Sequence, residues 1–370
     1  MIPYILIFAL VLFLISLSER LESKYKVLSK IIAVIAIVVL SLFAGLRNEN
    51  VGTDVLIYVK PYLIYIHNLG FKWAYQNLSS EILYICLTWI IDVIGGNINT
   101  LLFVITFIIS FLVYQYAINN RKETDVVLTY AVYLFVYFGI TLNLVRQSIA
   151  MAIILYSMKY LRKNDAGKYL LCVLIASGFH STAIIMLPLY LIYRFIGTQY
   201  ELIIKFLISG VSIVCVACSK TLIKYMYMLS NKYTVGYINR YLSNVINFNW
   251  LWEIIKILFL AIMLIFLRYD YNKKDNKYEK KYFEFCRFLL ILDFIFFQLG
   301  AIFTFSERFS YYFMIISYSY LLPCLIDSFK MKGKKEKIFG KIIVYFGLNV
   351  YFYVVFKILA VSSIIPYMLC

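Results

Sequence analysis

The chain has 370 residues, of which 63% are hydrophobic and only 15% are charged. A soluble domain is about 25% charged, and one aqueous core could not bury this much apolar surface, so the composition excludes an ordinary soluble protein. The net charge is +17, but the basic residues are clustered between apolar runs and form no basic face with stacking aromatic residues. A nucleic-acid partner is therefore not expected, and the composition indicates an integral membrane protein.

Apolar runs recur along the whole chain, and a helix needs roughly 17 to 25 such residues to cross a bilayer. The runs are residues 2–17, 27–45, 100–117, 126–142, 145–161, 202–219, 250–267, 285–305, 309–326 and 342–360. Two more stretches are ambiguous, because 81–94 is short and carries Asp92, whereas 169–193 is interrupted around His180. We predict an all-α polytopic bundle of about 10 to 12 spans, formed by residues 1–370 as a single integral membrane domain.

The positions of Lys and Arg orient these spans, because short cytoplasmic loops collect basic residues. The richest segments are residues 18–30, 159–168, 268–287 and 327–341. All of them are expected to face the cytoplasm, together with Arg121 and Lys122. The basic excess is therefore mainly a signal of orientation.

This orientation resolves the two ambiguous stretches. Segment 81–94 does not cross and lies on the outer surface as an amphipathic helix, whereas segment 169–193 enters and returns with His180 at its outer tip. Residues 46–99 then form an outer loop with amphipathic helices, and residues 220–249 form a second outer loop.

The first outer constellation of polar residues follows Arg47. Gly52 permits a tight turn, and Thr53 or Asp54 can cap the amphipathic stretch that continues through Tyr58. An equally weighted interpretation makes Asp54 an acceptor or general base for a sugar hydroxyl.

The second constellation, Asn143, Arg146 and Gln147, stands at the outer start of a span. The spacing favours an Arg146 side chain that simply extends to the interface. A guanidinium at a helix N-terminus nevertheless opposes the helix dipole. A bound anion would relieve that conflict, and pyrophosphate suits the planar donors of arginine.

The remaining constellations contain His180, Glu307 and Arg308. At an interrupted helix, His180 either satisfies backbone carbonyls, or transfers a proton or contacts a phosphate, because the pKa of histidine lies near the working pH. Glu307 and Arg308 either pair locally or provide a second anion-binding arginine. Lys256 and Asp293 lie inside spans, where they are expected to pair with each other as a structural contact.

In this order, these segments resemble the EpsG/Wzy-type polymerases of bacterial surface polysaccharides, the O-antigen polymerase family. The likeness extends over about residues 27–325. Its elements are L-R-x3-V-G-T-D-x3-Y (46–58), N-x2-R-Q-x2-A (143–150), F-H-x-[ST]-A (179–183) and E-R-F-S-Y-Y (307–312). Glu81 departs from the pattern, because Ile82 stands where relatives often have proline, and this leaves the role of Glu81 open.

The resemblance implies a multi-pass glycosyltransferase of the bacterial cytoplasmic (inner) membrane, with its active site facing the periplasm or outside. A growing glycan would move from polyprenyl pyrophosphate to a sugar hydroxyl of another lipid-linked repeat unit. No cofactor and no metal are implied. The implied partners are the polyprenyl-pyrophosphate-linked oligosaccharide and membrane lipid, and a chain-length regulator stays open.

The resemblance also implies roles for single residues. Arg146 and Arg308 would hold the pyrophosphate with help from Arg47, and His180 or Asp54 would activate the acceptor hydroxyl. The supporting residues would be Gln147, Asn143, Glu307 and Tyr58. A lipid-linked oligosaccharide flippase or other transporter, and an O-antigen ligase, are the alternatives. Against a transporter, the candidate residues share one face and the two halves of the sequence are not similar.

Overall fold

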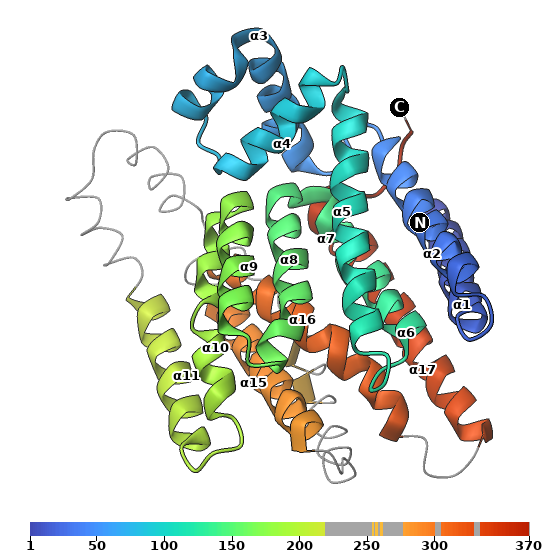
Figure 1. Ribbon diagram of the computed structural model, residues 1–370, viewed down its shortest axis with the longest axis vertical. Helices are drawn as coiled ribbons and strands as arrows, with labels where there is room; N and C mark the ends of the chain where they lie inside the picture. Colours follow the sequence, from blue (N-terminus) through green and yellow to red (C-terminus); the bar gives the residue numbers. More distant parts are fainter. Residues whose placement is uncertain are drawn as a thin grey trace. The chain divides into compact units, whose positions relative to one another are not determined.

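The computed structural model describes residues 1–218, 254, 256, 257, 260, 261, 277–299, 305–328 and 334–369, and every regular element within these ranges is a helix (Figure 1). The predicted all-α class is confirmed. The chain forms two compact units, Met1–Leu187 with Leu322–Cys370, and Pro188–Leu321. The prediction of a single domain stays a prediction, and the expected outer loop 220–249 and most of span 250–267 lie outside the described residues.

The first unit contains several long apolar helices. They are α1 (Ile2–Leu21), α2 (Lys26–Gly45), α5 (Ile98–Asn119), α6 (Val126–Val132) with η2 (Tyr133–Tyr137) and α7 (Phe138–Asn143), α8 (Val145–Arg162), and α17 (Lys334–Phe352) with η5 (Tyr353–Ile358). Within the described ranges, five helical stretches are long and apolar enough to cross a membrane, and all belong to this unit. In a bilayer a helix satisfies its own backbone groups, which explains why these apolar runs are helical.

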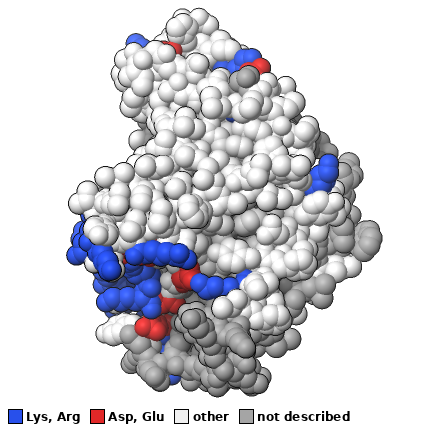
Figure 2. All heavy atoms as spheres, turned by 90° about the vertical axis from the view of Figure 1, so that its right-hand side faces the viewer, with Lys and Arg blue, Asp and Glu red and all other residues white. Residues whose placement is uncertain are grey.

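The basic turns of the first unit gather at one end. Arg121, in the turn after α5, pairs with Glu19 at 3.0 Å and also with Glu22, both at the end of α1. Arg162 at the end of α8 donates to Asn120 at 2.5 Å, and Lys341 of α17 pairs with Asp125 at 2.5 Å. On the face drawn in Figure 2, Lys and Arg gather toward one end beside a broad uncharged band. We refer to this end of the first unit as the basic end.

Helices α3 (Lys60–Asn77) and α4 (Ile82–Val93) lie at the other end of the unit (Figure 1). Glu81, which precedes α4, pairs with Arg146 in the first turn of α8 at 3.0 Å. Beyond the far end of α4, Asn99 donates to the Gly45 carbonyl at the end of α2 at 2.6 Å. Both ends of α4 therefore lie opposite the basic end, and α4 does not cross the unit, as predicted.

Residues 169–187, the part of the predicted hairpin 169–193 that belongs to the first unit, turn back at His180. Helix α9 (Ala166–Phe179) ends at His180, whose backbone is extended, and η3 (Ser181–Met186) runs back along α9. The Tyr169 hydroxyl near the start of α9 donates to the Met186 carbonyl at 2.6 Å. The break at His180 is thus confirmed, and it leaves the imidazole at the tip of the hairpin.

The last residues form a C-terminal strap, which we define as Val361–Leu369, against the first turns of the chain and the end of α2. The Tyr4 hydroxyl donates to the Ile364 carbonyl at 2.8 Å, and the Asn48 N–H donates to the Met368 carbonyl at 2.8 Å. The Tyr367 ring stacks on Phe43 with centroids 4.1 Å apart. The strap therefore holds the segment that leaves α2 and carries Arg47.

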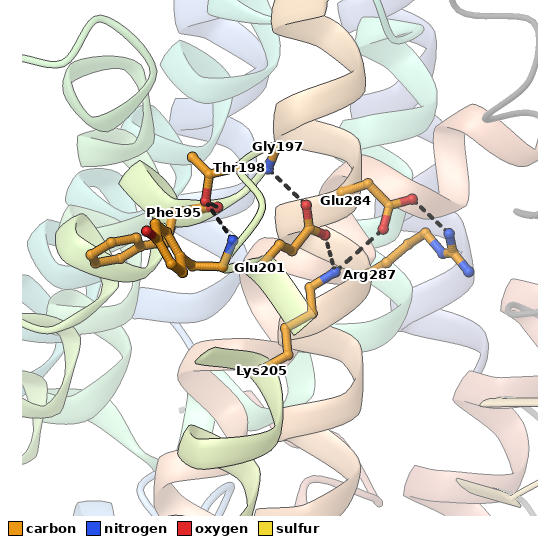
Figure 3. A network of polar contacts seen from close by, with 8 residues as sticks. Phe195, Gly197, Thr198, Glu201, Lys205, Glu284 and Arg287 are labelled. Carbon is orange, nitrogen blue, oxygen red and sulfur yellow. Dashed lines mark hydrogen bonds and ion pairs between the residues drawn. The ribbon is translucent and has the colours of Figure 1, made fainter. Parts of the chain in front are cut away.

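The second unit contains α10 (Leu189–Phe195), α11 (Glu201–Ala217), α15 (Lys277–Leu299) and the first part of α16 (Phe305–Ser328). Glu201 accepts the Gly197 N–H at 2.7 Å and pairs with Lys205 at 2.5 Å. Lys205 also approaches Glu284, which pairs with Arg287 at 2.6 Å (Figure 3). This network ties the turn between α10 and α11 to α15.

The second unit also contains the expected buried ion pair. The Lys256 ammonium lies 3.4 Å from the Asp293 carboxylate, and both side chains are buried. The Tyr318 hydroxyl of α16 donates to the same carboxylate at 3.1 Å. The predicted contact between Lys256 and Asp293 is confirmed.

Candidate functional site

The segment after α2 is braced by Arg47, a fully buried side chain. Its guanidinium donates to the carbonyls of Ala44 at 2.8 Å, Val51 at 3.2 Å and Leu142 at 2.8 Å. These bonds join the end of α2, the following loop and the end of α7. The geometry favours a structural role for Arg47, and its predicted part in pyrophosphate binding stays a prediction.

Gly52 and Asn143 fix the position of Asp54. Gly52 has φ +94°, and a Cβ there would lie 2.6 Å from the Leu142 carbonyl oxygen, so only glycine fits. The Asn143 carboxamide oxygen accepts the Thr53 hydroxyl and the Asp54 N–H, both at 3.0 Å. The loop is therefore docked on the end of α7, with the half-buried Asp54 at the start of η1 (Val55–Val59).

Arg146, in the first turn of α8, lies among tyrosines. Its guanidinium carbon is 5.5 Å from the ring centroid of Tyr58, 6.0 Å from that of Tyr62 and 5.9 Å from that of Tyr84. These cation–π distances favour the charged side chain. The rings come from η1, α3 and α4, so the elements of the outer loop converge on this one guanidinium.

The hydrogen bonds of Arg146 use only part of its donor set. Nη1 donates to the Ser80 hydroxyl at 3.1 Å and to Glu81 Oε2 at 3.0 Å. Within the described residues, Nε and Nη2 make no hydrogen bond, and the side chain is 19% exposed. Arg146 thus has two donor nitrogens with which to bind an anion.

Glu81 joins Arg146 to His180. While Oε2 accepts from Arg146, Oε1 accepts the Ser181 N–H at 2.9 Å and lies 3.3 Å from His180 Nδ1. The imidazole is buried, and its Nδ1 faces this carboxylate. The sequence left Glu81 open, and the structure places it at the centre of the site.

The pKa of Glu81 reflects these contacts. Burial alone would raise the pKa of this carboxyl, but the neighbouring His180 imidazole, the charge of Arg146 and the Ser181 N–H together lower it from 4.5 to about 2. Glu81 is therefore ionised at neutral pH. In the same site, burial raises the pKa of the Tyr84 hydroxyl far above its usual range, so Tyr84 stays neutral.

The other predicted site residues are divided between the two units. Gln147 is buried in α8, one residue after Arg146. Glu307 and Arg308 belong to α16 in the second unit, where Glu307 accepts the Tyr311 hydroxyl at 2.8 Å. The structure therefore brings together Asp54, Tyr58, Asn143, Arg146 and His180 in the first unit.

Sequence reasoning assigned no site role to the groups that complete the Arg146 environment, namely Ser80, Glu81, Tyr62 and Tyr84. A signal for Tyr62 was its position one helical turn after Tyr58, which puts both rings on one face.

In the described parts of the chain, no group of three His, Cys, Asp or Glu side chains could hold a metal ion.

The sequence model of the EpsG family matches residues 30–369 of the chain. This match covers nearly the whole chain, including all four motifs and Glu81. Comparisons with curated proteins and with solved structures gave no match.

Proposed function

Because the chain belongs to the EpsG family, a Wzy-type polymerase-like family, we propose that it polymerises a bacterial surface polysaccharide from polyprenyl-pyrophosphate-linked repeat units. In this proposal the protein crosses the bacterial cytoplasmic membrane and works at its outer face. The observation that supports it best is the convergence of Arg146, Glu81 and His180 at the end of the first unit opposite its basic turns.

Arg146 would bind the pyrophosphate of the donor. Its Nε and Nη2 would donate to phosphate oxygens, while the tyrosine rings and Glu81 hold the guanidinium in place. As the bond between the sugar anomeric carbon and the phosphate oxygen breaks, its electron pair leaves with the polyprenyl pyrophosphate. A fixed positive charge beside that oxygen stabilises the developing negative charge and lowers the barrier.

His180 would take the proton of the acceptor hydroxyl as the new bond to the anomeric carbon forms. Because Nδ1 faces Glu81 at 3.3 Å, the transfer would go through Nε2. The ionised Glu81 stabilises the resulting imidazolium, as a buried carboxylate does beside a catalytic histidine. These contacts favour His180 over Asp54, whose proposed role is then to orient the acceptor sugar.

The predicted supporting residues fit the same scheme. Asn143 holds the Asp54 backbone, Tyr58 covers the Arg146 guanidinium, and Gln147 is buried in the same turn of α8. Arg308, with Glu307 beside it in the sequence, is kept as a proposed second pyrophosphate ligand on the strength of its sequence motif alone. Arg47 is proposed to act through the loop that it braces.

The direct test is extension of a defined lipid-linked repeat unit by the purified full chain. Arg146→Ala should lower the rate by about 100-fold or more, since one group aimed at developing charge contributes on the order of 10² to 10³. His180→Ala should reduce the rate to a similar degree. Arg121→Gln at the basic end is the matched control and should keep normal activity, and normal extension by Arg146→Ala would refute the proposal.

Gene deletion separates the polymerase from its alternatives. Loss of a polymerase leaves a single repeat unit on the lipid core, whereas loss of a flippase or ligase leaves none. A gel of surface polysaccharide from the deletion strain distinguishes these outcomes. Complementation with Arg146→Ala should also give the single-unit pattern at a normal protein level.

A further inference from the structure

The first unit has a cavity at its basic end, opposite Arg146. Its volume is about 540 Å³, and it lies between the turn after α1, the first half of α2 and the last turns of α5. Neither the sequence motifs nor the proposed reaction uses it. Its walls change in character along their length, from charged at the rim to apolar deeper along the helices.

The rim is positively charged. Lys26 and Lys30 stand one turn apart on α2, and among the described residues neither makes an ion pair. The acidic residue of the rim, Glu22, pairs with Arg121. Its charge is therefore balanced, and the two ammonium groups give the rim a net attraction for an anion.

The rest of the lining is mainly apolar and open to the side, and it also includes Ser29, Tyr114 and Gln115. Ala33, Val34 and Ile37 continue along α2 below the lysines, and Phe111 of α5 faces them across the cavity. Val34 is 44% exposed and Phe111 is 38% exposed, so the cavity opens on the surface that would meet lipid tails. An ordinary hydrated anion gains nothing from such a wall.

The dimensions fit one leaflet. Eleven residues separate Lys26 from Ile37, a rise of about 16 Å along a helix, and half of a bilayer hydrocarbon core is about 15 Å. A phosphate beside the lysines and an acyl chain reaching Ile37 would therefore span the cavity. The lysine side chains would keep their charge at the headgroup level.

We propose that this cavity binds an anionic phospholipid of the leaflet at the basic end. The lipid phosphate accepts from Lys26 and Lys30, and one acyl chain lies between α2 and α5. A lipid bound there contacts both helices and stabilises their packing by mass action. This inference rests on the fold and the membrane location, and it is independent of the reaction proposed above.

The test is native mass spectrometry of the full chain in a mild detergent, titrated with phosphatidylglycerol or phosphatidylcholine. Phosphatidylglycerol should bind more tightly than phosphatidylcholine. Each lysine is expected to contribute about fivefold in affinity, so Lys26→Gln with Lys30→Gln should lose on the order of 25-fold. Lys24→Gln, an exposed neighbour outside the cavity, is the charge control and should bind normally.

A second variant tests the part of the cavity that would hold the acyl chain, without changing the charge of the protein. Val34→Trp should fill the cavity and displace the lipid, whereas Val27→Trp on an exposed site outside the cavity should not. Millimolar inorganic phosphate should fail to compete. Three results would each overturn the proposal. They are a loss of lipid affinity in Lys24→Gln as large as in the double lysine variant, unchanged lipid binding to Val34→Trp, and full displacement of the lipid by inorganic phosphate.

Discussion

At the scale of single residues, the candidate site depends on a carboxylate shared between a guanidinium and an imidazole. Glu81 uses one oxygen for Arg146 and the other for Ser181 and His180. One anion therefore holds a guanidinium and faces an imidazole. This arrangement makes the charge of Glu81 more important than its volume.

Glu81→Gln, which keeps the shape and removes the charge, tests this point. The pKa of Glu81 falls from 4.5 to about 2 on folding, so the unfolded chain binds the proton first as pH falls. The stabilisation, about 3 kcal/mol, is complete above about pH 4.5 and is lost as pH falls toward 2. Melting temperatures of wild type and Glu81→Gln should differ most at neutral pH, and the difference should shrink as pH falls from about 4.5 toward 2.

Asp92→Asn is the control for that measurement. Asp92 also pairs with a histidine, His67, but its partner is exposed, and an exposed pair contributes little. Its effect on melting should be small at every pH. A Glu81→Gln difference that stays constant down to pH 3 would show that the ionised carboxylate is not the stabilising group.

Gly52 provides a second prediction at this scale. Gly52→Ala combines a positive φ with a Cβ 2.6 Å from the Leu142 carbonyl oxygen, whereas Gly95 has φ +74° with no atom within 4 Å. Gly95→Ala should cost about 1 kcal/mol in backbone strain. Gly52→Ala should lower the melting temperature clearly more and reduce extension, and equal shifts for the two variants would show that the close approach is unimportant.

At the scale of helices, buried polar contacts fix which elements pack together. In the second unit, Lys256 meets Asp293 of α15, and Tyr318 of α16 donates to the same carboxylate. Removing one charge leaves the other buried and unpaired, which is much more costly than removing both.

A double-mutant cycle at this pair should therefore be strongly non-additive. Lys256→Met and Asp293→Leu should each destabilise the protein by about 3 to 5 kcal/mol, whereas the double variant should recover most of that loss. Thermal unfolding in detergent measures all four proteins. Additive losses of stability would mean that Lys256 and Asp293 do not interact. The same cycle with Lys205→Met and Glu284→Leu, a more exposed pair, serves as the comparison.

At the scale of the whole molecule, the first unit separates its charges by end. Basic turns lie at one end, and the Arg146 site with α3 and α4 lies at the other. A reporter fused after Asn99 should therefore behave as extracytoplasmic and one fused after Lys163 as cytoplasmic. If both reporters gave the same signal, the orientation inferred from Lys and Arg would be wrong.

The sequence predicted the helices better than the site. The lengths of the apolar runs alone located α1, α2 and α5 to within a few residues of their ends. This works because a helix must stay apolar over the whole thickness of the lipid core. The break at His180 was also visible as an interruption. By contrast, Glu81, Tyr62 and Tyr84 meet Arg146 only because α3 and α4 fold back over α8. No periodicity within one segment encodes a contact between segments 60 to 90 residues apart in this chain.

The C-terminal strap has a practical consequence for handling the protein. Met368 and Leu369 contact Asn48 and Arg47, so a purification tag or fluorescent fusion joined directly after Cys370 would pull on the loop that positions Asp54. Protein tagged in that way should extend a lipid-linked repeat unit more slowly than untagged protein in the assay proposed above. A cleavable tag, or a long flexible linker after Cys370, would leave the strap seated on α2.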